Sequence, residues 1–161
     1  MRKIVFAGLA VLGGLVMSNA QCKTVSAISE NFDGWKDIDK CWTAQQGKAM
    51  IYSKDKKVVF YSMTNPREKM FLMTPKIKAG KYMLTLDASD NGGETTLEIF
   101  SVNNVSDAKS YVAVTKAAKI DGAKKTFDIV LKKDANIGLK VVLNGIHQAV
   151  YVDNFSLKAK N

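Results

Sequence analysis

The segment KYMLTLDAS, residues 81–89, alternates apolar and polar side chains with a period of two. Tyr82, Leu84 and Leu86 fall on one face of an extended strand, and the residues between them are mainly polar. The segment TFDIVL, residues 126–131, repeats this pattern. A strand with one apolar and one wet face is typical of an antiparallel sheet that covers a core from one side. Two such sheets must face each other.

Short apolar runs with period two recur along the rest of the chain after residue 20, and none shows a sustained 3.6-residue period. Turn signals such as Asn91-Gly92 and Asn144-Gly145 separate them and favour antiparallel connections. The fold class predicted is all-β, an antiparallel two-sheet β-sandwich with jelly-roll topology. Strands are expected at residues 24–28, 49–53, 57–64, 69–77, 81–89, 95–102, 110–116, 126–132, 138–143 and 149–158.

Residues 1–20 have the character of an export signal. Arg2 and Lys3 precede an apolar run over residues 4–17, and small residues follow at 18–20. That run is shorter than the roughly 20 residues of a membrane span, and no later run approaches this length. We therefore expect residues 21–161 to form a single exported domain, extracellular or periplasmic, with no transmembrane segment.

The chain carries a formal charge of +9, and removal of Arg2 and Lys3 with an acid-free signal leaves +7. The lysines are spread along the sequence, which indicates a solvated, mutually repelling surface, although attraction to anionic glycans is also open. No nucleic-acid signature accompanies the charge. His147 is the only histidine, and no glycine-rich phosphate loop or cysteine cluster occurs, so an enzyme is not expected.

The two cysteines, Cys22 and Cys41, leave three alternatives open. An oxidising compartment favours a disulfide between them. Lipidation of Cys22 is disfavoured because Gln21, the residue before it, is not small. The third alternative is a buried Cys41 thiol beside Trp42, with Cys22 on a frayed end.

Asp153 stands out in the segment VYVDNFSL, residues 150–157. Regular alternation would place its carboxylate on one face with Tyr151, Phe155 and Leu157, three residues that belong in a core. An unpaired carboxylate facing a core is costly, so this position needs a physical explanation.

One explanation is a structural calcium ion. The segment SENFDGW, residues 29–35, supplies Glu30 and Asp33, and the terminal segments of a jelly roll usually pair. Calcium takes six to eight oxygen ligands, so Glu30, Asp33 and Asp153 together with loop carbonyls would make a site. The alternative is a β-bulge at Asp153, where the carboxylate accepts hydrogen bonds from backbone amides and no metal binds.

The segments SENFDGW, KCWTA (residues 40–44), LMTPKIKAGKYMLTLDAS (residues 72–89) and VYVDNFSL occur in an order that resembles choice-of-anchor J and cleaved-adhesin domains of secreted Bacteroidetes-type proteins. Those domains are similar to galactose-binding-like jelly rolls that serve as carbohydrate-binding modules. The resemblance covers nearly all of residues 21–161. It implies a jelly-roll sandwich with a structural calcium bound by Glu30 or Asp33 and by Asp153.

Sugar recognition needs exposed aromatic planes with polar groups at their rim. Trp35, Trp42 and Tyr61 are the candidate ligand-binding residues, and packing in the core is the alternative for each of them. The polar segment at residues 101–111 is either a binding loop or a connector. The expected function is a secreted, non-catalytic carbohydrate-binding module. An adhesin-like or envelope domain that binds a cell-surface protein is the alternative, and a small secreted hydrolase ranks last.

Overall fold

The computed structural model describes residues 22–46, 49–63 and 67–160. The expected export signal at residues 1–20 lies outside these residues. Within them, no helix is long and apolar enough to cross a membrane. The elements are β1 (Ile28–Glu30), β2 (Thr43–Gln45), β3 (Met50–Lys54), β4 (Lys57–Ser62), β5 (Glu68–Ile77), β6 (Gly80–Asp90), β7 (Thr96–Val102), the 3-10 helix η1 (Ala108–Ser110), β8 (Tyr111–Ala113), β9 (Ala118–Lys119), β10 (Lys124–Leu131), β11 (Ala135–Leu143) and β12 (Gln148–Ala159).

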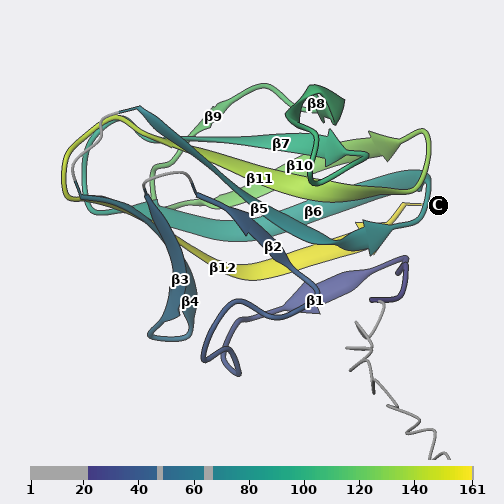
Figure 1. Ribbon diagram of the computed structural model, residues 1–161, viewed down its shortest axis with the longest axis horizontal. Helices are drawn as coiled ribbons and strands as arrows, with labels where there is room; N and C mark the ends of the chain where they lie inside the picture. The colour runs from purple at the N-terminus through teal and green to yellow at the C-terminus, as the bar shows by residue number, and fades with distance from the viewer. Residues whose placement is uncertain (1–21, 47–48, 64–66, 161) are drawn as a thin grey trace, which may run out of the picture.

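The strands form two stacked sheets (Figure 1). Sheet I has the order β10-β6-β12-β4-β3, with β1 added alongside β12, and sheet II has the order β2-β5-β11-β7-β8, with β9 added alongside β7. The pairings between these strands are antiparallel. The chain passes from one sheet to the other at every connection except β3–β4, β7–β8 and β8–β9. The predicted all-β, two-sheet antiparallel sandwich is confirmed.

The core lies between the sheets and is built by the alternation seen in the sequence. Leu84 and Leu86 of β6 are fully buried and belong to the same core cluster as Leu139 and Val141 of β11. The intervening residues of β6 face out of the sandwich and are half-buried or exposed. Burial of an aliphatic side chain of this size contributes about 1.5–3 kcal/mol, so the apolar period of each strand fixes which face turns inward.

The N-terminal segment joins both sheets. β1 pairs with β12, with Glu30 opposite Phe155, so the predicted meeting of the two ends is confirmed. Ahead of β1, Val25 forms a parallel bridge to Ile77 at the end of β5. A disulfide between Cys22 and Cys41 closes this segment, with their Cα atoms 5.6 Å apart. Of the three alternatives for the cysteines, the structure contains the disulfide.

The strand β12 contains a bulge that corrects the expectation about Asp153. Its register against β6 shifts after Asp153, and Asn154 has a φ of 49° in the left-handed region. One extra residue in a strand reverses the facing of all residues after it. Tyr151 and Asp153 therefore face out of sheet I, whereas Phe155 and Leu157 point into the core and are at most 1% exposed. The shared face expected from regular alternation is wrong, and the bulge alternative is present.

Residues 103–110 fold over the outer face of sheet II. The Tyr111 hydroxyl donates a hydrogen bond to the Val105 carbonyl (2.6 Å), and the Gln45 side chain donates to the same oxygen. Burial raises the pKa of the Tyr111 phenol. Beneath this loop, Met73 and Val102 are fully buried although they lie outside the inter-sheet cluster. Most of the polar segment at residues 101–111, expected to be either a binding loop or a connector, thus packs against sheet II.

Candidate functional site

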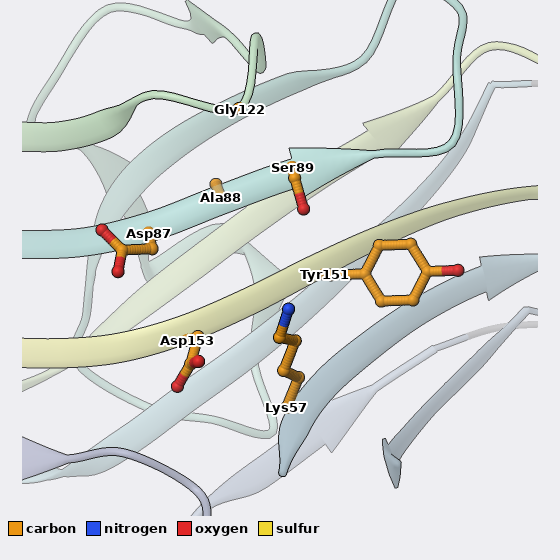
Figure 2. Close-up of a pocket in the computed structure, with 7 residues that line it drawn as sticks. All are labelled: Lys57, Asp87, Ala88, Ser89, Gly122, Tyr151 and Asp153. Atoms are coloured by element: carbon orange, nitrogen blue, oxygen red, sulfur yellow. The ribbon is translucent and has the colours of Figure 1, made fainter. Parts of the chain in front are cut away.

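A pocket of about 250 Å³ opens on the outer face of sheet I (Figure 2). Its walls come from β4, β6, β12 and the turn before β10. The polar side chains among the lining residues include two carboxylates and one ammonium group, and one aromatic ring lies beside them. The lining residues are Lys57, Asp87, Ala88, Ser89, Gly122, Tyr151 and Asp153.

The register of sheet I brings these side chains together. Asp153 on β12 is directly opposite Asp87 on β6, and Tyr151 is directly opposite Ser89. Cross-strand partners project to the same side of a sheet, so the two carboxylates are close neighbours on the outer face. In Figure 2 the Lys57 side chain rises between Asp153 and Tyr151. The pocket thus places an aromatic ring at one end and paired carboxylates at the other.

Asn154, the bulge residue, organises the carboxylate end. Its side-chain nitrogen donates to Asp87 Oδ2 (2.8 Å), and its backbone N–H donates to Asp153 Oδ1 (2.7 Å). Within the described residues, neither Asp87, Asp153 nor Lys57 belongs to an ion pair. Like charges directly opposite on adjacent strands destabilise a sheet. A residue pair that breaks a local rule of this kind is typical of functional sites.

Partly exposed tyrosines, Tyr52, Tyr61 and Tyr151, cover the neighbouring part of the same face, which we call the tyrosine face. Tyr151 is opposite Val59 of β4, which is opposite Tyr52 of β3. Val59 is only 1% exposed although it lies outside the inter-sheet cluster. Val59 thus lies between two tyrosines on neighbouring strands, a position that accounts for its burial. Tyr61 adds a third tyrosine on this face, and its hydroxyl is 2.9 Å from His147 Nδ1.

The two tryptophans lie elsewhere, at one end of the core. Trp42 is 7% exposed and contacts Phe155 edge to face, with ring centroids 5.3 Å apart. Trp35 is half-buried and contacts both Trp42 (5.4 Å) and Phe32 (4.8 Å). The packing alternative therefore describes Trp42, and Trp35 packs against the core. Of the three predicted ligand-binding residues, only Tyr61 lies on the outer face of sheet I.

The predicted calcium ligands each have other partners. Glu30 Oε1 accepts the backbone N–H of Phe32 (2.9 Å), and Asp33 accepts the Asn31 side-chain amide (3.2 Å). Asp153 belongs to the pocket described above. No group of three or more histidines, cysteines, aspartates or glutamates that could hold a metal occurs within the described part of the chain. The ends of the chain meet, but these three carboxylates do not gather, and the calcium site stays a prediction.

No protein-family model matches the sequence, and a search of curated proteins finds no match. Solved structures do match. The K1 cleaved adhesin domain of Lys-gingipain from Porphyromonas gingivalis W83 has a TM-score of 0.65 at 15% identity, over 84% of this chain and 99% of that domain. The protein has the cleaved-adhesin fold. The K3 cleaved adhesin domain of the same protein matches with a TM-score of 0.64 at 12% identity, over 82% of this chain and 98% of that domain.

Family 29 carbohydrate-binding modules share this fold. One matches with a TM-score of 0.55 at 12% identity, over 81% of this chain and 85% of that module. A variant complexed with cellulohexaose matches with a TM-score of 0.55 at 11% identity, over 81% of this chain and 90% of that module. Other variants in which a lysine, an aspartate or a tyrosine is replaced by alanine, made to probe ligand recognition, match too. The predicted resemblance to cleaved-adhesin domains and to carbohydrate-binding modules is confirmed at the level of fold.

The sequence partly indicates the pocket residues that are not among its predicted site residues. Asp87 and Ser89 occupy the polar phase of the segment at residues 81–89, which places them on a solvent-facing surface. Regular alternation predicts a core position for Tyr151, and the bulge that turns it outward is only one of two alternatives that the sequence leaves open. Which solvent-facing residues become neighbours depends on strand pairing, and the alternation of a single strand does not contain that information.

Proposed function

We propose that this protein is an exported, non-catalytic module that binds a glycan on the outer face of sheet I. In this proposal the Tyr151 ring stacks against a pyranose, and Lys57, Asp87, Ser89 and Asp153 bond to its hydroxyl groups. The observation that carries the proposal is the cross-strand pair of Asp87 and Asp153 beside the Tyr151 ring. Stacked aromatic rings with a few convergent polar groups are the usual elements of a sugar-binding surface.

The charged groups of the pocket are suited to neutral sugars. A carboxylate is an acceptor only, and its hydrogen bonds to hydroxyl groups are stronger than those between neutral groups. Lys57 supplies donors within the same pocket. The fold shared with a module complexed with cellulohexaose supports a β-linked glucan chain as the first ligand to test. The lysine, aspartate and tyrosine probed in that family are side-chain types that this pocket also contains.

Export is supported by the disulfide between Cys22 and Cys41, because such bonds persist in oxidising compartments. The absence of catalysis is proposed from the arrangement of the acids. Asp87 and Asp153 lie side by side on one surface of a sheet, whereas a glycoside hydrolase holds its two carboxyl groups on opposite sides of the bond it cleaves.

Replacement of Tyr151 by alanine tests the proposal. We expect the affinity for cellohexaose, measured by calorimetry, to fall by about tenfold or more, because the central aromatic residue of an interface usually contributes most of its binding energy. Asp153→Asn weakens binding as well, and it raises the melting temperature because a repulsive carboxylate pair is removed.

The matched control is Tyr111→Ala, which removes a tyrosine from the outer face of sheet II. It leaves the affinity unchanged. A glycan array screens other sugars in parallel. Equal affinity of the wild-type protein and the Tyr151→Ala variant for every glycan that binds would exclude this face as the site.

A cell-surface protein is the second candidate ligand, and one observation favours it. Met50, Met63 and Ile146 are 43%, 50% and 62% exposed, a large exposure for apolar side chains. Met50 is opposite Tyr61, so part of this apolar surface continues the tyrosine face. Exposed apolar side chains next to aromatic rings are typical of protein interfaces. Glycan arrays without binding, together with a protein ligand sensitive to Met50→Lys, would favour this candidate.

We also propose a structural calcium ion bound by one acid of the N-terminal segment, Glu30 or Asp33, together with Asp153 and loop carbonyls, supported by the pairing of β1 with β12. Calcium at 100 times its dissociation constant would stabilise the fold by about 2.7 kcal/mol. The expected result is a rise in melting temperature with calcium that a chelator reverses, and a smaller rise with magnesium. No rise with calcium would assign the three carboxylates to the hydrogen bonds described above.

A further inference from the structure

A second pocket, of about 400 Å³, lies beside the disulfide. Its walls come from five parts of the chain that are distant in sequence, one of which is Val105 in the loop over sheet II. Thr24 belongs to the N-terminal segment, Lys40 and Thr43 to the region around Cys41, Lys76 to the end of β5, and Asn136 to the start of β11. This pocket is separate from the pocket on the outer face of sheet I, because no residue lines both pockets.

The charge of this pocket has one sign. Lys40 and Lys76 both line it, and no aspartate or glutamate does. Neither lysine forms an ion pair with any residue that the structure describes. Two ammonium groups that share a concave surface without a counter-charge repel each other and raise the local concentration of anions.

Three other lining residues, Thr24, Thr43 and Asn136, have polar side chains, beside Pro75, Val105 and the disulfide. Thr24 and Thr43 contribute hydroxyl groups, and the Asn136 side chain is fixed by donating to the Thr74 carbonyl (2.7 Å). The N-terminal wall is attached to β5 by two backbone hydrogen bonds, from Val25 N to Lys76 O and from Lys78 N to Val25 O, each 2.9 Å. Hydroxyl groups beside two cations favour a ligand with an anionic group on a polar body.

We propose that this pocket binds the anionic group of a ligand, a carboxylate or a sulfate, between Lys40 and Lys76. The site is independent of the glycan-binding face and does not rest on it. The disulfide is part of the wall, since both cysteines line the pocket. The site is therefore complete only in the oxidised protein, and an oxidising compartment is where ligands of this kind, such as sugar acids and sulfated glycans, occur.

The test uses tetragalacturonate as the carboxylate probe and a heparin-derived tetrasaccharide as the sulfate probe. Binding is measured by calorimetry and by amide chemical shifts of the full-length oxidised protein. We expect Lys40→Ala/Lys76→Ala to lower the affinity for at least one probe by about tenfold, because both charged contacts are removed. The shifts should concentrate at Thr24, Thr43 and Asn136.

The matched control is Lys132→Ala/Lys133→Ala, which removes the same charge from two exposed residues that do not line the pocket. This variant keeps the affinity. Tyr151→Ala also keeps it, which separates this site from the glycan-binding face. An equal loss of affinity in both lysine variants would show that binding follows net charge alone and would overturn the proposal, as would the absence of binding to both probes. Reduction of the disulfide that lowers probe binding by more than it lowers the fraction of folded protein supports the role of the disulfide in the site.

Discussion

Replacement of Trp42 by alanine will destabilise the fold by about 3–5 kcal/mol, the range measured for large aromatic residues in protein cores. The ring of Trp42 is 7% exposed and contacts Phe32, Trp35 and Phe155 edge to face. Removing it leaves a cavity that these rings fill only partly, since Phe155 is fixed on β12 and Phe32 has a φ of 59° next to β1. Urea denaturation followed by circular dichroism measures the change.

Tyr52→Ala is the control for this prediction, because it removes an aromatic ring from a half-buried position on the outer face of sheet I. Its cost is expected to be smaller, about 1 kcal/mol. Trp42→Phe should fall between the two. A Trp42→Ala variant that unfolds at the same urea concentration as the wild type, yet fails to bind glycan, would contradict the structure and return this residue to ligand recognition.

Loss of the disulfide between Cys22 and Cys41 will cost about 3 kcal/mol. The bond closes a loop with a sequence separation of 19, and the entropy removed from the unfolded chain by a loop of this length is of that order. The Cys22→Ser/Cys41→Ser variant should therefore unfold at a lower urea concentration. The wild-type protein should move to the same midpoint when a reducing agent is added.

The double variant itself serves as the control for the reducing agent, because its midpoint should not change on reduction. A wild-type midpoint insensitive to reduction would mean that the N-terminal segment contributes nothing to the cooperative unit. The backbone hydrogen bonds of Val25 to β5 argue against that outcome, as they tie this segment to sheet II.

The strands that the sequence predicts well are the long ones with a buried face. The expected strands at residues 81–89 and 126–132 correspond to β6 (Gly80–Asp90) and β10 (Lys124–Leu131). Burial of one face repeats an apolar residue at every second position, and this repeat is a local property that any single strand displays.

The short strands at the sheet edges are predicted poorly. The sequence predicts neither β2 (Thr43–Gln45) nor β9 (Ala118–Lys119), and the strand expected at residues 110–116 is shortened to β8 (Tyr111–Ala113). Each of these pieces has at most three residues and no buried side chain. Their strand conformation comes from backbone pairing with β5 or β7, a contact that side-chain pattern does not encode.

The sequence alone determined that the chain forms a two-layered sandwich of antiparallel strands, because apolar alternation requires each sheet to cover the other. It also predicts that the two ends of the chain pair, and it leaves the disulfide as one of three alternatives for the cysteines. Tertiary structure alone decided which acids become neighbours. Asp153 lies opposite Asp87, on a different strand, and a single bulge at Asn154 turns Asp153 outward. Because side chains alternate with a period of two, one extra residue in a strand moves the side chains on one side of the bulge to the opposite face of the sheet.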